Sequence, residues 1–131
     1  MSEKHTARVA EHRAAQDVVV AHGTSGGATV VSLRGDIDLL SVATLSERLD
    51  ALTAHTRPDL VVDLRSVTFI DCTGLGALCR ARNRTLARQG RLRLVTESTA
   101  FRRMLRITGL AEVFELHTRL PRPLPGDQEV S

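Results

Sequence analysis

The sequence predicts one α/β domain with a central, mostly parallel sheet, and three observations support this. Short β-branched or apolar segments alternate with amphipathic segments of about a dozen residues, in the order β-β-α-β-α-β-α-β. One of the short segments, Leu60–Leu64, is almost continuously apolar, as in a strand covered on both faces. The chain has 131 residues, enough for one ordinary hydrophobic core. We therefore expect a single sheet with right-handed crossover helices.

An N-terminal β-hairpin is predicted by two strand-like segments around a glycine-rich loop. The segments are Asp17–His22 and Ala28–Leu33, and the loop is Gly23–Gly27. A phosphate-binding P-loop needs Gly-Lys-Ser/Thr after its spacer, and this loop has no lysine. Residues 1–16 are polar and alanine-rich, and we expect them to form a mobile tail.

Two helices are predicted from apolar stripes on either side of the strand Leu60–Leu64. The first follows a loop, Asp36–Leu39, and the second runs from Gly74 to Gln89, with Gly90 expected to end it in the C′ position. Arg82 falls near the apolar face of the second helix and must pair or extend to solvent. The first stripe is Val42, Leu45, Leu49 and Leu52; the second is Leu75, Leu78, Cys79 and Leu86; Arg80, Arg84 and Arg88 form a separate basic ridge.

The last third of the domain predicts a strand, a helix and a short strand. Leu92 and Leu94 alternate with arginines, and Ser98 is a candidate N-cap for a helix that ends at Gly109. The last strand is expected over Val113–Leu116. We place the domain at residues 17–117. Residues 118–131 carry three of the four prolines and are expected to be disordered or loosely packed.

Composition and charge argue against several classes of function. The net charge is +3, but the chain has no Trp or Tyr to stack on bases, so we expect no direct binding of nucleic acid. The five histidines and two cysteines show no ligand spacing, and we expect neither a metal nor a cofactor. No apolar run is long enough to cross a membrane and no signal peptide is evident, so a cytoplasmic protein is expected.

The stretch FIDCTGLGAL, residues 69–78, carries the candidate functional site. A strand passes into a helix through Asp71-Cys72-Thr73-Gly74, and a helix N-terminus presents free backbone N–H groups. Open α/β sheets place their sites at such turns. Gly74 and Gly76 lack side chains, so another chain has room to approach the backbone. The residue types alone are equally consistent with a tight turn capped by Asp71 or Thr73.

Three blocks of the sequence resemble the STAS-domain anti-sigma factor antagonists. DCTGLGAL, residues 71–78, resembles their Asp-Ser-Ser/Thr-Gly-Leu-Gly motif. STAFRRMLRITGL, residues 98–110, is similar to their third helix, and LRGDIDLLSVATL, residues 33–45, is similar to the segment that opens their first helix. The blocks occur in the family order and with the family spacing, and the resemblance extends over residues 17–117. The resemblance implies a single STAS-like domain.

The resemblance also implies a function and a set of site residues. Unphosphorylated members of the family bind an anti-sigma factor with a GHKL-type kinase fold and so release a sigma factor. That kinase phosphorylates the serine after the motif aspartate, which abolishes the complex, and a phosphatase restores it. Cys72 occupies this switch position here, and Thr73 is the neighbouring candidate for phosphorylation. The implied partner-binding residues are Asp36, Asp38, Leu39, Asp71, Gly74, Leu75 and Gly76.

Three alternatives to this function remain open. A STAS domain can serve as an accessory subunit of a lipid-trafficking or anion transporter. Cys72 at a helix N-terminus can act as a redox-sensitive thiol, although the adjacent Asp71 opposes a thiolate. A catalytic role is the weakest alternative, because the sequence shows no His–Asp–nucleophile arrangement. We expect a non-enzymatic regulator that is a monomer or weak dimer.

Overall fold

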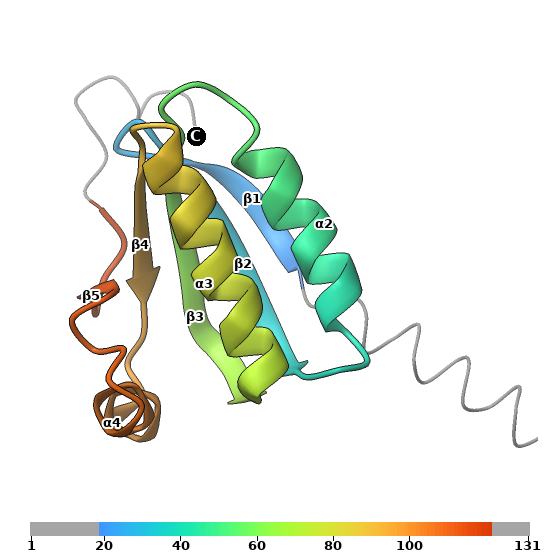
Figure 1. Ribbon diagram of the computed structural model, residues 1–131, viewed down its shortest axis with the longest axis vertical. Helices are drawn as coiled ribbons and strands as arrows, with labels where there is room; N and C mark the ends of the chain where they lie inside the picture. Colours follow the sequence, from blue (N-terminus) through green and yellow to red (C-terminus); the bar gives the residue numbers. More distant parts are fainter. Residues whose placement is uncertain (1–18, 122–131) are drawn as a thin grey trace, which may run out of the picture.

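The computed structural model describes residues 19–121, which form one five-stranded sheet with helices (Figure 1). The strand order is β1-β2-β3-β4-β5, and only the β1–β2 pair is antiparallel. The predicted α/β fold class and order of elements are therefore confirmed. The predicted tail at residues 1–16 lies outside the described residues. The strands are β1 (Val19–Ser25), β2 (Ala28–Ile37), β3 (Asp59–Ile70), β4 (Arg91–Val95) and β5 (Glu115–His117), and the helices are α2 (Val42–Leu52), α3 (Cys72–Ala87) and α4 (Thr99–Ile107).

The hairpin turn is shorter than the predicted loop Gly23–Gly27. Ser25 pairs directly with Ala28, so only Gly26 and Gly27 connect β1 to β2. Both glycines have positive φ, 60° and 85°, which suits the two-residue type I′ turn that matches strand twist. Gly23 belongs to the strand, because main-chain pairing continues through it despite its weak strand propensity.

Strands β2 and β3 extend further than their apolar patterns predicted. β2 continues from Leu33 to Ile37, and β3 continues from Leu64 to Ile70. The two strands pair in parallel to their ends, where Ile37 is aligned with Ile70. Most side chains beyond Leu64 are exposed, which is why no apolar run marks this part of β3. Asp36 therefore lies in a strand, where the sequence predicted a loop.

Helices α2 and α3 lie side by side on one face of the sheet, and α4 lies at its β4 side (Figure 1). The predicted stripe on α2 is confirmed, because Leu45 and Leu49 are buried while Val42 and Leu52 pack against the core at its edge. On α4, Ser98 accepts a hydrogen bond from the Phe101 N–H at 3.0 Å and is the predicted N-cap. The core shared by these elements includes Val31, Leu33, Ile37, Leu45, Leu49, Leu60, Val62, Leu78, Leu94, Phe101 and Leu105.

Helix α3 differs from the prediction in its first residue, in the exposure of Leu86 and in the residue that takes the left-handed conformation at its end. The helix begins at Cys72 rather than Gly74, and Leu86 is 48% exposed although it was assigned to the apolar stripe. Gln89, with φ 61°, holds the left-handed position expected for Gly90. Gly90 is required for another reason, since a Cβ there would lie 2.1 Å from the Pro58 carbonyl oxygen. Arg82 pairs as predicted, because its Nε donates to the Val113 carbonyl oxygen at 2.7 Å.

The segment after β5 is held against the second face of the sheet. β5 itself is Glu115–His117, shifted from the predicted Val113–Leu116. Leu120 packs on a small second cluster of buried side chains, and the Ser25 hydroxyl donates to the Pro121 carbonyl oxygen at 2.8 Å. Leu120 and Pro121 therefore contact the domain, whereas Thr118 and Arg119 are exposed. Residues 122–131 lie outside the described part of the chain, and the disordered or loosely packed tail stays a prediction. The second cluster is Ala28, Val30, Val61 and Val95.

Candidate functional site

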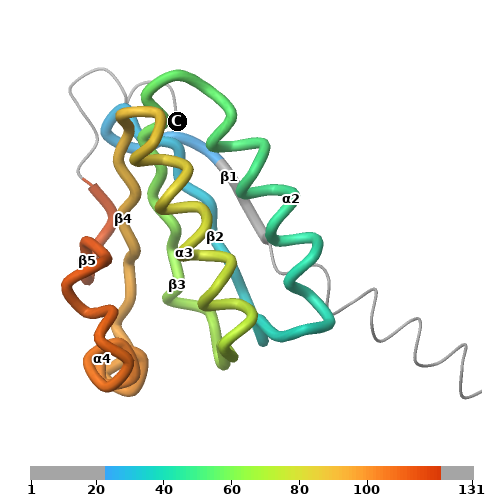
Figure 2. The backbone as a smooth tube through the Cα atoms, viewed as in Figure 1, coloured from blue at the N-terminus to red at the C-terminus, as the bar shows by residue number. Residues whose placement is uncertain are grey.

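The β2–α2 and β3–α3 junctions lie at the same end of the sheet, because the two strands are parallel and end in register (Figures 1 and 2). A backbone hydrogen bond joins them: the Asp71 N–H donates to the Ile37 carbonyl oxygen at 3.0 Å. The two segments that the sequence predicted as partner-binding, around Asp38 and around Asp71, are therefore neighbours in space.

Asp71 is the N-cap of α3. Its Oδ1 accepts hydrogen bonds from the Thr73 hydroxyl at 2.6 Å, the Thr73 N–H at 2.9 Å and the Gly74 N–H at 3.0 Å. These bonds, with a further contribution from the Leu39 N–H, hold the pKa of Asp71 below its ordinary value, the Thr73 hydroxyl having the largest effect. Of the two capping candidates, Asp71 is thus the cap, and Thr73 is the second residue of the helix.

Cys72 is the first residue of α3, and its side chain is exposed. Thr73 beside it is half-buried, and its hydroxyl is engaged by Asp71. The thiol and the hydroxyl therefore differ in accessibility although they are adjacent in sequence. Cys79, about two turns further along the helix, is a free thiol packed at the edge of the core.

Gly74 and Leu75 lie beneath the surface, contrary to the expectation that Gly74 leaves space for a partner. A Cβ on Gly74 would lie 2.6 Å from Ile37 Cγ2 and 2.9 Å from Ile70 Cγ1, so its missing side chain allows the helix to approach β2 and β3. Leu75 is buried in the core. Gly76 is half-exposed, and a Cβ there would meet only Arg80 Nη1 at 3.5 Å.

The loop between β2 and α2 is closed by its own hydrogen bonds. The Ser41 hydroxyl donates to the Asp36 carbonyl oxygen at 3.1 Å, and it accepts from the Asp38 N–H at 3.1 Å. The Asp38 carboxylate accepts from the Leu40 N–H at 3.0 Å. Ser41 is fully buried, so the loop has a fixed shape, and the carboxylate of Asp38 is partly used to hold it.

Three large apolar side chains are exposed around these junctions. Leu39 is 70% exposed, Leu40 53% and Phe69 55%. The Thr68 hydroxyl beside them donates to Asp36 Oδ1 at 2.6 Å and links β3 to β2. We define the junction surface as Asp36, Asp38, Leu39, Leu40, Phe69, Asp71, Cys72 and Gly76.

Two members of the junction surface, Leu40 and Phe69, are not among the partner-binding residues predicted from the sequence. Leu40 could have been included, because two adjacent leucines, Leu39 and Leu40, in a segment rich in turn residues indicate exposed apolar side chains. Phe69 opens the stretch FIDCTGLGAL, but its exposure could not be predicted, because it lies in the part of β3 beyond the apolar run.

Metal binding and membrane insertion find no support in the described residues. Between residues 19 and 121, no three His, Cys, Asp or Glu side chains are grouped closely enough to hold a metal ion. No helix in the same range combines the length and apolar content needed to span a bilayer.

The parallel sheet and the exposed strand-to-helix turns define a small α/β domain whose candidate site is a surface at one end of the sheet. Residues 20–118 match the family model described as "Mlab, STAS domain". The chain therefore belongs to the STAS-domain anti-sigma factor antagonist family.

Three relatives illustrate the match. The anti-sigma-F factor antagonist RsfB of Mycobacterium tuberculosis is 29% identical over 113 residues, which cover 86% of this chain and 92% of that protein. The anti-sigma-B factor antagonist of Bacillus subtilis is 32% identical over 89 residues, covering 68% and 81%. The crystal structure of an anti-sigma factor antagonist from Mycobacterium paratuberculosis superposes with a TM-score of 0.71 at 30% identity, covering 80% and 89%.

Proposed function

We propose that this protein is an anti-sigma factor antagonist that binds an anti-sigma factor of the GHKL kinase type through the junction surface. The observation that carries the proposal is the exposure of Leu39, Leu40 and Phe69 around the switch position, Cys72. Relatives that share most of the chain are named as antagonists of anti-sigma factors. Binding of a sigma factor's inhibitor makes the protein a non-enzymatic regulator of transcription.

The chemistry of the junction surface defines the partner that would fit it. Exposed apolar side chains at the centre of an interface gain free energy when a partner removes them from water. Asp36, Asp38 and Asp71 add negative charge around them, so a complementary surface combines an apolar centre with basic residues. The closed Asp38–Ser41 loop presents Leu39 in a fixed conformation, which lowers the entropy lost on binding.

Cys72 makes the proposed complex insensitive to the kinase activity of the partner. A phosphate at this position would place a charge of about −1.5 to −2 in the interface. A thiol side chain cannot become a phosphoserine, and it is close to a serine in volume. We therefore propose that the protein stays in its binding-competent form, with no need for a phosphatase.

A titration with a GHKL-type anti-sigma factor from the same organism tests the proposal by calorimetry. Leu39→Asp should weaken binding at least tenfold, because it places a charge in the apolar centre, and it should barely change thermal unfolding, since Leu39 is 70% exposed. Leu86→Asp is the matched control: Leu86 is an exposed leucine near the opposite end of α3 and should leave affinity unchanged.

A pull-down with the wild-type chain distinguishes the two candidate roles. Recovery of an anti-sigma factor, lost with Leu39→Asp and kept with Leu86→Asp, supports the antagonist. Recovery of a transporter ATPase in its place, or equal binding by the two variants, contradicts the proposal.

A further inference from the structure

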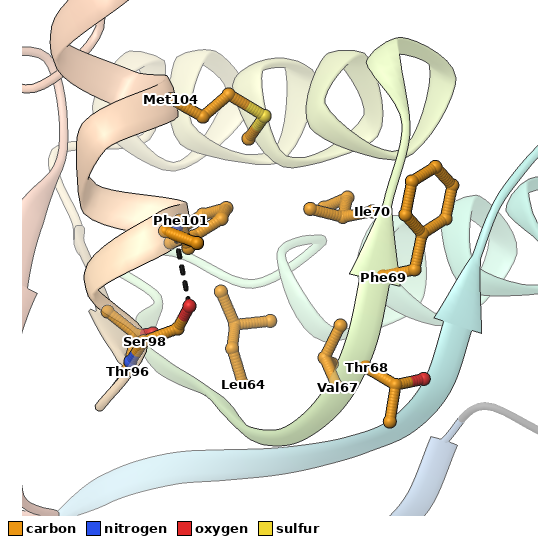
Figure 3. Close-up of a pocket in the computed structure, with 10 residues that line it drawn as sticks. Leu64, Val67, Thr68, Phe69, Ile70, Thr96, Ser98, Phe101 and Met104 are labelled. Carbon is orange, nitrogen blue, oxygen red and sulfur yellow. Dashed lines mark hydrogen bonds between the residues drawn. The ribbon is translucent and has the colours of Figure 1, made fainter.

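An apolar groove lies between the outer half of β3 and helix α4 (Figure 3). Its volume is about 220 Å³. Leu64 and Ile70 on β3 point toward Phe101 on α4, and Met104 closes one side. The groove is separate from the second face of the sheet, which Leu120 covers.

The unequal lengths of β3 and β4 create this groove. β4 pairs with β3 only from Asp59 to Asp63, and the chain then leaves the sheet after Val95. β3 continues to Ile70 with β2 on one side and no β4 partner on the other. Helix α4 lies across this gap, but a helix cannot come as close to a strand as another strand does, so space remains between their side chains.

The lining of the groove selects a neutral ligand. None of the ten lining residues is charged: Leu64, Val67, Thr68, Phe69, Ile70, Thr96, Ser98, Ala100, Phe101 and Met104. An apolar space of about 150 Å³ holds a molecule such as benzene, whereas sites for drug-sized ligands begin at about 300 Å³. The volume of this groove lies between those two, which indicates a compact molecule.

Two hydroxyl groups give the groove one polar end. Thr96 Oγ1 accepts the Ser98 N–H at 3.1 Å, and Ser98 Oγ accepts the Phe101 N–H at 3.0 Å. Within residues 19–121 neither hydroxyl donates to an acceptor. Ser98 is exposed, so its O–H can donate to a ligand oxygen, whereas Thr96 is buried beneath it. The Thr68 hydroxyl, in contrast, is occupied by Asp36.

We propose that this groove binds a compact neutral molecule that has a hydrocarbon body and one hydrogen-bond acceptor, such as a ketone or ester oxygen. The hydrocarbon body packs between β3 and α4, and the acceptor takes a hydrogen bond from the Ser98 hydroxyl. Phe69 borders both this groove and the junction surface, but the ligand site does not depend on the proposed docking function, and its test uses the free chain without a partner.

Amide chemical shifts from nuclear magnetic resonance test the proposal with three compounds of similar size: acetophenone, ethylbenzene and benzoate. Acetophenone should shift resonances of the groove residues saturably, ethylbenzene should bind more weakly because it has no acceptor, and benzoate should be weakest because burial of its charge is unfavourable. Ala100→Phe, which fills the mouth of the groove from an exposed position on α4, should weaken acetophenone binding at least tenfold.

The matched control is Ile107→Phe, which adds similar bulk on the same helix outside the groove and should leave acetophenone binding unchanged. Thermal unfolding of both variants establishes that they are folded. Absence of saturable shifts with either neutral compound overturns the proposal, and so does equal loss of binding in the two variants. Shifts in the groove caused only by a protein partner would assign it to the docking interface and overturn the ligand site.

Discussion

Gly74 and Gly76 lie two residues apart in α3, yet their surroundings predict opposite effects of the same substitution. Gly74→Ala should reduce the free energy of unfolding by about 1–3 kcal/mol, because its Cβ would overlap Ile37 and Ile70. Gly76→Ala should raise it by about 0.5–1 kcal/mol, because Ala is the better helix former and its Cβ meets only Arg80 at 3.5 Å. Urea denaturation of the two variants measures both changes in the free energy of unfolding. A similar change at both positions would contradict the close packing described for Gly74.

The carboxylate of Asp71 contributes stability that depends on pH. Its pKa is lowered in the folded chain, mainly by the Thr73 hydroxyl, so its contribution is present above the unfolded pKa of about 3.9 and is lost as the pH falls through the lower folded value. Asp71→Asn should therefore lower the free energy of unfolding at pH 7. Near pH 3 the free energies of unfolding of the variant and the wild type should become more similar. Urea titrations at the two pH values measure these free energies.

Ser98→Ala supplies the control for Asp71, because Ser98 is an uncharged N-cap on α4. It should cost about 0.5–2 kcal/mol equally at both pH values. The difference in free energy of unfolding between Asp71→Asn and the wild type should change with pH. A constant difference would show that the carboxylate charge does not stabilise the start of α3.

Under the proposed function, Cys72 is expected to prevent a kinase partner from inactivating the protein. Wild-type protein incubated with the GHKL partner and ATP should gain no phosphate at residue 72 and should stay bound. Cys72→Ser should restore phosphorylation and release, and Cys72→Asp should weaken binding by placing a charge at the exposed helix start. Mass spectrometry and calorimetry follow the two effects.

Cys79→Ser controls for a hydroxyl introduced elsewhere on α3, and it should not be phosphorylated because Cys79 packs against the core. Thr73 is the rival acceptor, but its hydroxyl would first have to leave the Asp71 carboxylate, 2.6 Å away. Stoichiometric phosphate on Thr73 in the wild-type protein, with release of the partner, would contradict the proposal that the protein stays in its binding-competent form.

At the scale of elements, the lengths of the strands create both proposed surfaces. Because β2 and β3 run together to Ile37 and Ile70, their following turns project beyond the end of β4. The same extension carries Phe69 to the junction surface and leaves the groove beside α4. A strand that ended at Leu64, as the apolar pattern alone indicated, would provide neither.

The basic ridge of α3 is expected to be a solvated helix face. Arg84 Nη1 pairs with Asp50 on α2 at 3.1 Å, and Arg80 and Arg88 are exposed. Replacing all three arginines with glutamine should leave binding to duplex or single-stranded DNA equally weak at physiological salt, as filter binding can measure. Tight binding by the wild-type chain that the triple variant loses would make α3 a nucleic-acid surface.

Acid should destabilise the whole molecule, because the shifted carboxyl groups act in the same direction. Arg91, and secondarily His117, lower the pKa of Glu115 from its ordinary 4.5 to about 2. Burial raises the pKa of Asp63, but its hydrogen bonds and charge interaction with Arg65 outweigh this effect and leave it lowered. Stability from these groups is present above about pH 4.5 and is lost as the pH falls toward 2.

Urea denaturation between pH 6 and pH 2.5 measures this loss. With Glu115→Gln the free energy of unfolding should fall less steeply as the pH is lowered, because the substitution removes the carboxyl group whose pKa is shifted most. Glu112→Gln is the control: Glu112 is exposed and forms no ion pair within residues 19–121, so the decline should stay as in wild type. An identical acid profile in all three proteins would contradict the role of Glu115.

The sequence by itself determined the order of elements, the buried stripe of α2, the cap at Ser98 and the motif around Cys72. These features depend on residues close together in the chain: apolar periodicity, turn residues and capping side chains repeat at spacings that backbone geometry dictates. The family resemblance followed from the same local blocks and was confirmed by the match over residues 20–118.

Only the tertiary structure decided what depends on contacts between distant residues. The ends of β2 and β3 form because each strand satisfies the other's backbone groups, although their exposed side chains show no strand pattern. Gly74 is needed because Ile37 lies against it, and Gly90 because Pro58 does. Leu86 is exposed because the buried face of α3 runs through Leu78, Ala81 and Thr85. Leu86 lies about 100° around the helix from Thr85, and the apolar pattern alone did not show which edge of the stripe faces the core.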